Sequence, residues 1–188
     1  MRPHSLTERR GRLVAYLASV RLPFGLDCPT CHLVTVDKMI VPSFEVVMRW
    51  LTQGQIPHYL CEQCHGIHIV DIQSLEGVLE SRLFVESEGL MFTTELEIRP
   101  VGLLPLVADL GRLNMNYPTL KIFVDVVDDN LPRLMICDTI HIAAGLTDEQ
   151  LQLFMTSAIT GMKQLYGECE QAGYLNPPEE SAGASAVH

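Results

Sequence analysis

Two neighbouring stretches near the middle of the sequence alternate apolar and polar residues with the two-residue period of a β-strand. Residues 81–86 and 90–99 show this alternation, and only Ser-Glu-Gly at 87–89 separates them. A three-residue connection that ends in glycine is typical of a β-hairpin, because glycine readily adopts the positive φ that such a loop needs. One side of 90–99 is almost entirely apolar and the other mostly charged, so we expect an antiparallel sheet with one face packed and one facing water.

A second pair of strands is predicted further along the chain. Residues 120–126 and 134–140 again alternate, and Asp128-Asp129-Asn130 lies between them. This acidic segment lacks the glycine and the distant glutamate of a calcium loop, whereas Asp and Asn are common in turns. We therefore interpret it as a turn between two strands. Shorter extended pieces are expected around residues 58–62 and 66–71.

Three segments have the apolar periodicity of amphipathic helices. The first begins after Pro42-Ser43 and ends at Gly54, and the second covers residues 103–110. The third begins at Thr147, where Thr147 and Gln150 have the spacing of a capping box. Helices and hairpins are thus segregated along the chain, which predicts an α+β fold with an antiparallel β-sheet and three helices.

Composition and charge exclude several classes of protein. Of the 188 residues, 47% are hydrophobic and 19% charged, which excludes a wholly disordered chain. The sequence contains no uninterrupted apolar run of the roughly 20 residues that a bilayer span requires, so we expect no membrane insertion. The net charge of −10 has the wrong sign for binding phosphate backbones, and we expect no direct contact with nucleic acid.

Four of the six cysteines form two Cys-x-x-Cys pairs, which suggests a metal site. Cys28, Cys31, Cys61 and Cys64 are candidate ligands of one tetrahedral zinc ion. The alternatives are that the second pair is simply packed, or that it acts as a redox sensor. No nucleotide-binding loop, metalloprotease motif or recognisable catalytic spacing accompanies the cysteines. We therefore expect a non-enzymatic protein without a bound cofactor, and keep a small structural zinc-binding protein as the alternative.

From residue 36 onwards the chain resembles the YbjN family, close to its enterobacterial branch, which includes a virulence-associated regulator. The resemblance covers about 130 residues in order, and the following stretches carry it: Val41-Pro42, Trp50-Leu51, Cys61-x-x-Cys64, Arg99-Pro100, Leu104-Pro105-Leu106, Ala108-Asp109-Leu110, Asp128-Asp129-Asn130-Leu131-Pro132, Cys137, and Gly145 with Thr147, Glu149 and Gln150. It implies a fold like that of class I type III secretion chaperones, usually dimeric. It also implies a non-enzymatic regulator of stress response, motility, exopolysaccharide production and virulence, which acts through protein–protein interactions.

The resemblance and the charge pattern suggest three parts of the chain. Residues 1–35 carry a net charge of +3 and have no counterpart in the family, so we expect them to be a non-native or disordered extension. Residues 36–175 form the YbjN-like domain, and 176–188 are expected to be a disordered tail. We hypothesise that translation starts at Val36 or Met39, which intact-mass measurement of natively expressed protein would test. The Cys-x-x-Cys pairs are more typical of reduced thiols or metal ligands than of a secreted disulfide framework, and we find no clear export signal, so we expect the protein in the cytoplasm.

The second predicted helix carries more leucines than one buried face requires. Leu106, Leu110 and Leu113 are offset from the neighbouring apolar stripe, so we expect part of this set to be exposed. Together with Leu120 and Ile122 on the following strand, they are candidates for a homodimer interface. The other expected partner is a protein that the sequence does not identify.

Overall fold

The computed structural model describes residues 39–126 and 131–176. The predicted extension at 1–35, the turn residues 128–130 and nearly all of the predicted tail, residues 177–188, lie outside the described residues. All statements below concern the described part of the chain.

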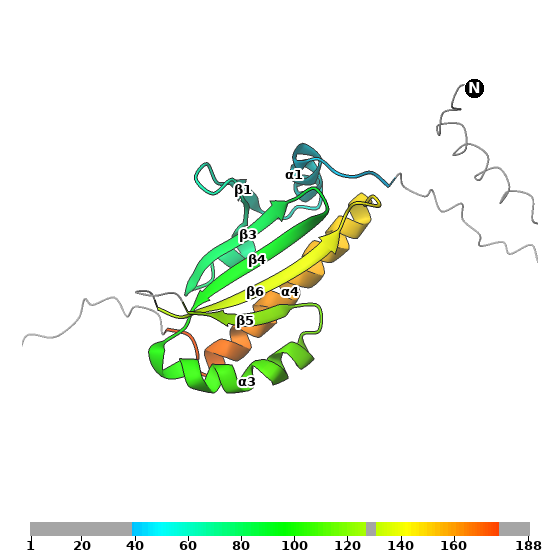
Figure 1. Ribbon diagram of the computed structural model, residues 1–188. Coiled ribbons are helices and arrows are strands. Elements are labelled where there is room, and N and C mark those ends of the chain that lie inside the picture. The colour runs from blue at the N-terminus through cyan, green and yellow to red at the C-terminus, as the bar shows by residue number, and fades with distance from the viewer. Residues whose placement is uncertain (1–38, 127–130, 177–188) are drawn as a thin grey trace, which may run out of the picture. The chain divides into compact units, whose positions relative to one another are not determined.

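The helices and the pairs of strands follow one another along the chain in the order that the sequence predicts. The elements are α1 (Phe44–Gln53), β1 (His58–Leu60), β2 (Ile67–Ile69), α2 (Val70–Gln73), β3 (Val78–Val85), β4 (Gly89–Glu97), the 3-10 helix η3 (Pro100–Gly102), α3 (Leu103–Asn116), β5 (Lys121–Asp125), β6 (Arg133–His141) and α4 (Asp148–Gln171). The six strands form one antiparallel sheet in the order β1-β2-β3-β4-β6-β5. The predicted α+β fold is confirmed, with the one-turn helix α2 as an addition (Figure 1).

The helix ends follow the local signals in the sequence. The Ser43 side chain accepts a hydrogen bond from the main chain of Val46 at the start of α1, and Gly54 follows its last residue. The capping box predicted at α4 is present, since the Thr147 and Gln150 side chains each accept a hydrogen bond from the other residue's main-chain N–H. Such caps satisfy donors that the first helical turn leaves unpaired.

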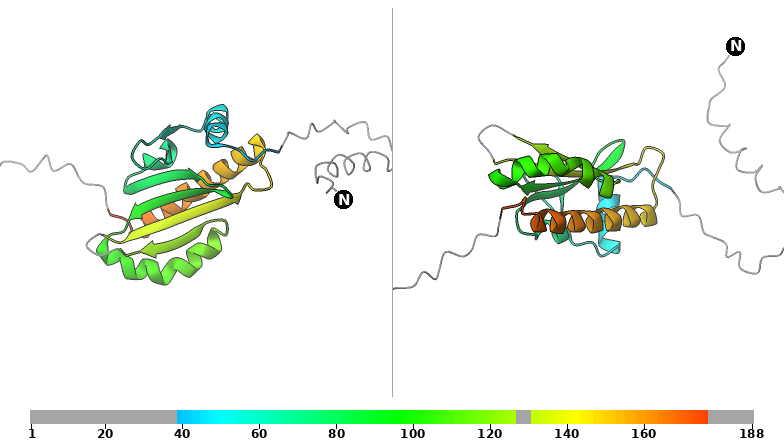
Figure 2. Two further views of the ribbon diagram at one scale, coloured as in Figure 1. Left: turned by 45° about the horizontal axis from the view of Figure 1, so that its top comes forward. Right: turned by 90° about the horizontal axis from the view of Figure 1, so that it is seen from below.

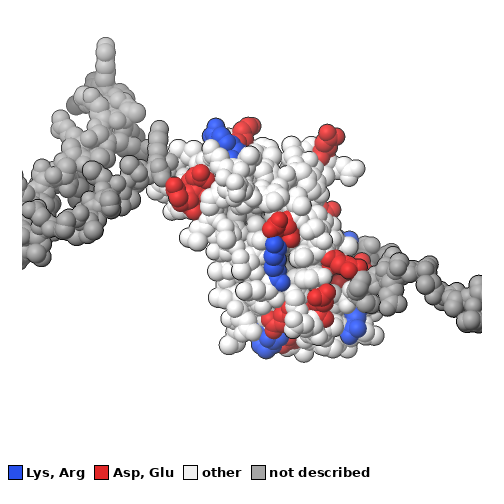
Figure 3. All heavy atoms as spheres, turned by 180° about the vertical axis from the view of Figure 1, so that it is seen from behind, with Lys and Arg blue, Asp and Glu red and all other residues white. Residues whose placement is uncertain are grey.

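The helices occupy one face of the sheet and one of its edges. The long helix α4 lies behind the sheet, with α1 and α2 beside it, and α3 runs next to the edge strand β5 (Figures 1 and 2). On the α4 side, charged residues form small groups of both signs on a largely uncharged surface (Figure 3). No described helix crosses the front of the sheet, which we call the open face (Figure 2).

Helix α3 protects the edge of β5 with a single polar side chain. The Asn114 amide donates to the Ile122 carbonyl at 3.0 Å, and its oxygen accepts from the Ile122 N–H at 3.1 Å. These two bonds replace those that a further strand would make. An edge strand with unpaired main-chain groups invites pairing with another chain, so this contact closes the edge at its centre.

Most of the residues predicted for a dimer face on α3 and β5 lie in the core of the single chain. Leu106 and Leu113 are completely buried within the single chain, and Leu110 is partly buried, because this side of the helix packs onto the core. Leu120 and Ile122 are only 4% exposed. Side chains already buried in one chain have no surface left for a second. The exposed apolar side chains of η3 and α3 lie on the opposite, outer side and are Val101, Leu104, Val107 and Met115.

Candidate functional site

The loop between β1 and β2 is a tight turn built around the second Cys-x-x-Cys pair. The Cys61 N–H donates to the Gly66 carbonyl, and the His65 N–H donates to the Cys61 carbonyl, both at 3.1 Å. His65 has a φ of 55°, in the left-handed region that is uncommon for residues other than glycine. The turn brings Cys61 and Cys64 to the same end of the β1–β2 hairpin.

A histidine from the returning strand completes a cluster with these two cysteines. The ligand atoms of Cys61, Cys64 and His68 all lie within 4.8 Å of one another. The Cys64 Sγ and His68 Nε2 atoms are 3.3 Å apart. The His68 ring is buried and stacks on Tyr59, with 4.8 Å between ring centroids and 12° between planes. Two thiols and one held imidazole are a donor set that suits a soft divalent metal.

The surroundings of Cys61 and of two other cysteines, Cys137 and Cys169, shift their thiol pKa values in opposite directions. Main-chain N–H groups of Cys64 and Gln63 point at the Cys61 sulfur and lower the pKa of its thiol. Burial raises the pKa of the Cys137 thiol, and it raises that of Cys169 to about 12. The β1–β2 turn therefore favours the thiolate of Cys61, whereas burial favours the neutral thiols of Cys137 and Cys169.

The cluster belongs to the open face of the sheet. Strand register places Tyr59, His68, Arg82, Thr93, Cys137 and Lys121 in one cross-strand row that spans all six strands. Directly opposed residues of antiparallel strands project to the same side. His68 is therefore at one end of a surface that continues to the far edge of the sheet.

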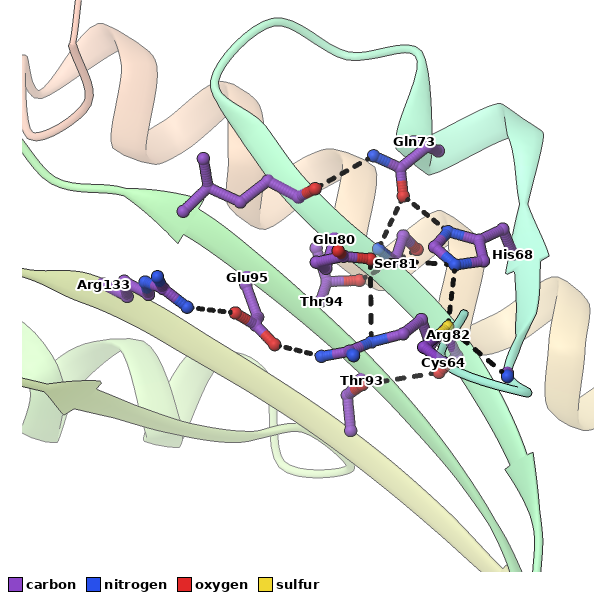
Figure 4. A network of polar contacts seen from close by, with 12 residues as sticks. Cys64, His68, Gln73, Glu80, Ser81, Arg82, Thr93, Thr94, Glu95 and Arg133 are labelled. Carbon is purple, nitrogen blue, oxygen red and sulfur yellow. Dashed lines mark hydrogen bonds and ion pairs between the residues drawn. The ribbon is translucent and has the colours of Figure 1, made fainter. Parts of the chain in front are cut away.

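An arginine–glutamate network occupies the centre of this face (Figure 4). Glu95, only 6% exposed, accepts hydrogen bonds from Arg82 of β3 with one carboxylate oxygen and from Arg133 of β6 with the other. The Glu80 carboxylate lies between this network and the cluster, 3.8 Å from Arg82 Nε and 3.7 Å from His68 Nε2. Charged groups thus connect the cysteine cluster to the middle of the sheet.

Apolar side chains surround the network. The half-exposed rings and methionines of the face include Phe84, Met91, Phe123 and Met135, placed there by strand register. The Arg82 guanidinium lies 5.4 Å from the centre of the Phe84 ring, and the Lys121 ammonium 5.6 Å from that of Phe123. A surface of aromatic and Met side chains with arginine at its centre has the composition of a protein-binding site.

Two of the four cysteines predicted to bind zinc lie in the cluster. Cys61 and Cys64 are close together, whereas Cys28 and Cys31 lie outside the described residues. The sequence pattern did not identify His68 as a candidate ligand. The available signal was the spacing Cys64-x-x-x-His68, in which a tight turn returns the chain past the cysteines.

The fold and this site define an α+β protein with one uncovered sheet face and no recognisable catalytic motif. The YbjN family, described as "Putative bacterial sensory transduction regulator", matches residues 43–171, and the chain belongs to this family. Proteins named YbjN from Escherichia coli K12, E. coli O157:H7 and Shigella flexneri are each 28% identical over 145 residues, which is 77% of this chain and 92% of theirs.

The crystal structure of YbjN from E. coli has the same fold. It superposes with a TM-score of 0.70 at 28% sequence identity, over 74% of this chain and 99% of that one. Within the described residues, no helix has both the length and the apolar character that a membrane span requires.

Proposed function

We propose that this chain is a non-enzymatic regulator that acts by binding another protein through the open face of its sheet. One observation carries the proposal: among the described residues no helix covers this face of the six-stranded sheet, and aromatic and Met side chains there surround an arginine–glutamate network centred on the buried Glu95 carboxylate. A sheet normally packs its second face or makes it polar. An uncovered mixed face with apolar side chains is what a docking partner would bury.

The processes that it regulates, following the family resemblance, are stress response, motility, exopolysaccharide production and virulence in the cytoplasm of a bacterium. The net charge of −10 supports action through proteins rather than by direct contact with nucleic acid. The likeness to class I type III secretion chaperones belongs to the same proposal, since those proteins also act by holding other chains.

A site-specific crosslinking experiment tests the open face. A photo-reactive amino acid replaces Phe123, 37% exposed on the open face, and in a matched strain it replaces Leu153, 69% exposed on the outer side of α4. We expect crosslinked adducts from the first position and few from the second. In a deletion strain, wild-type protein should restore motility and polysaccharide levels, whereas a folded Phe123→Lys variant should not. Equal complementation by both would refute the proposal.

We also propose that two copies of the chain associate through the outer side of α3. Leu104 is 79% exposed and Val107 is 48% exposed, and with Val101 and Met115 they form an apolar stripe on one side of the helix. A two-fold interface buries each of these residues twice. Light scattering should show a dimer at tens of micromolar, and Leu104→Glu with Val107→Glu should give a monomer with unchanged far-UV circular dichroism. A monomeric wild-type protein would refute the dimer.

A further inference from the structure

We propose that Cys61, Cys64 and His68 bind a zinc ion, with the Glu80 carboxylate as the fourth ligand. This site lies at the end of the open face, and the proposal does not depend on the identity of the docking partner. It also differs from a four-cysteine site, because it needs neither Cys28 nor Cys31.

The spacing of the donor atoms fits a tetrahedral ion. Zinc bonds of about 2.3 Å to sulfur and about 2.0 Å to nitrogen, at a tetrahedral angle, place the two donors about 3.5 Å apart. Cys64 Sγ and His68 Nε2 are 3.3 Å apart, and Cys61 Sγ is within 4.8 Å of both. The three side chains are therefore close to the arrangement that one ion would hold.

The tautomer of His68 is determined by its other neighbours. The Gln73 amide donates to the Leu79 carbonyl at 3.2 Å, and its oxygen accepts from the Ser81 N–H at 2.8 Å, so the orientation of the amide is set by the main chain. The same oxygen is 3.1 Å from His68 Nδ1, which must therefore carry the proton. Nε2 is left with its lone pair directed at Cys64 (Figure 4). A hydrogen bond from the second ring nitrogen is the usual support of a metal-bound histidine.

Main-chain N–H groups of the turn also lie against both sulfurs. Main-chain N–H groups of Cys64 and Gln63 point at the Cys61 sulfur, and the Gly66 N–H donates to Cys64 Sγ at 3.4 Å. Zinc binds the thiolate, so each coordinating thiol gives up its proton when the ion enters. These N–H donors would support the sulfurs as ligands, in the way that outer hydrogen bonds support metal ligands in general.

The Glu80 carboxylate is the candidate for the fourth ligand, and its side chain would have to move toward the sulfurs, because the described ligand atoms within 4.8 Å of one another are those of Cys61, Cys64 and His68 without Glu80. Its Oε2 is buried and has no hydrogen-bond partner among the described residues, and it lies 3.7 Å from His68 Nε2. The nearby Arg82 Nε is likewise buried and unpartnered. The Glu80 side chain is 39% exposed and this oxygen lies 3.8 Å from Arg82 Nε, so its charge is partly balanced, and a bound cation would add the direct contact that the oxygen lacks. Coordination of Glu80 would connect the ion directly to the arginine–glutamate network of the open face.

A thiol–imidazole pair without metal is the competing interpretation. Cys64, His68 and Gln73 also have the order of a nucleophile, a base and an orienting amide. That arrangement does not use Cys61, whose sulfur receives main-chain hydrogen bonds of its own. Two sulfurs, one imidazole nitrogen and a carboxylate together match zinc better than either a lone nucleophile or a hard cation such as magnesium.

The full chain provides its own matched control, because Cys28 and Cys31 form another Cys-x-x-Cys pair outside the proposed site. Zinc content is measured by mass spectrometry after purification without chelators, for wild type, Cys28→Ser/Cys31→Ser and Cys61→Ser/Cys64→Ser. We expect one zinc per chain in the first two and none in the third. Cobalt titration of the Cys28→Ser/Cys31→Ser chain should give the absorption of a tetrahedral ion with two thiolates. Zinc that is lost with Cys28 and Cys31 would overturn the proposed ligand set.

Two further variants test the supporting residues. Gln73→Ala should raise the zinc dissociation constant by about 10–100-fold, as is usual when the hydrogen-bond partner of a metal-bound histidine is removed. Glu80→Gln should also weaken binding, and an unchanged dissociation constant would overturn Glu80 as a ligand. These variants leave both cysteines in place.

A footprint on the unaltered chain does not depend on any variant folding. Added zinc should protect Cys61 and Cys64 from alkylation by iodoacetamide, with half-buried Cys137 as the internal control. Alkylation of Cys64 at the same rate with and without zinc would overturn the proposal and favour the metal-free pair.

Discussion

Replacing Glu95 by glutamine should weaken a polar contact that links three neighbouring strands. Glu95 lies on the central strand β4, and each of its oxygens accepts from an arginine of a different neighbouring strand, Arg82 of β3 and Arg133 of β6. Glutamine has nearly the same shape but only one oxygen. Its NH₂ group would face one guanidinium, so one arginine loses its acceptor and both lose the compensating charge.

The size of the effect follows from the burial of the three groups. A hydrogen bond to a charged group contributes about 1.5–3 kcal/mol to stability. Glu95 is 6% exposed, but the arginine side chains are 22% and 34% exposed, so water partly replaces the lost acceptor. We therefore expect Glu95→Gln to lower the free energy of unfolding by about 1–2 kcal/mol.

Urea unfolding at neutral pH measures this loss with two probes. Far-UV circular dichroism reports on the whole fold, and the fluorescence of Trp50, the single tryptophan, reports on α1. The matched control is Glu97→Gln, on the same strand and face, whose Oε1 accepts from Asn176 and keeps an acceptor after replacement. Its change should stay within about 0.5 kcal/mol. If Glu95→Gln costs no more than this control, the bridging role of the carboxylate is refuted.

Three further predictions concern α3 and α4. Leu106→Ala should lower the free energy of unfolding by about 2–5 kcal/mol, because Leu106 is fully buried. Leu104→Ala, measured on dilute monomer, should leave it nearly unchanged. If urea unfolding shows the larger loss for Leu104→Ala, the assignment of Leu106 to the buried side of α3 is contradicted. The hydrogen bond from Arg112 holds the pKa of Glu168 below its usual range. The interaction therefore contributes fully to folding stability above about pH 4.3, the pKa of Glu in the unfolded chain, and this stability is lost as pH falls through the lower pKa of the folded state. The stability advantage of wild type over Arg112→Met should therefore shrink on acidification, as pH-dependent melting would show. Thr147→Ala removes the cap of α4 and should cost about 1 kcal/mol, and no change in melting temperature would argue against the capping box.

Local features of the fold could be read from the sequence because their causes are local. The β3–β4 hairpin was predictable from the alternation of its two strands, but the positive φ expected at Gly89 was wrong. Gly89 instead begins β4, where a Cβ would meet the Ile140 carbonyl oxygen at 3.1 Å. The capping box at Thr147 needs only residues three apart. The short helix α2 was missed because a single turn has too few residues to show a helical period.

The candidate site was only half predictable. A Cys-x-x-Cys pair is visible as a spacing, and Cys61 with Cys64 proved to be adjacent in space. His68 belongs to the same hairpin but has its tautomer determined by Gln73, which is held in turn by main-chain groups of β3. Such a chain of contacts involves three elements, and no periodicity in the sequence encodes it.

The sequence by itself determined the strands, the main helices and the alternation that sends successive strand residues to opposite faces, since these depend on the backbone periods of 2 and 3.6 residues. Only the tertiary structure decided that β4 pairs with β6, that Leu106 rather than Leu104 faces the core, and that no described helix covers the open face. An amphipathic pattern predicts that one face of a helix is buried, but α3 has two apolar stripes, one with Leu106 and one with Leu104, and only one of them can pack onto the core. The outcome depends on which stripe the neighbouring sheet and α4 can cover, and that is a property of the assembled fold.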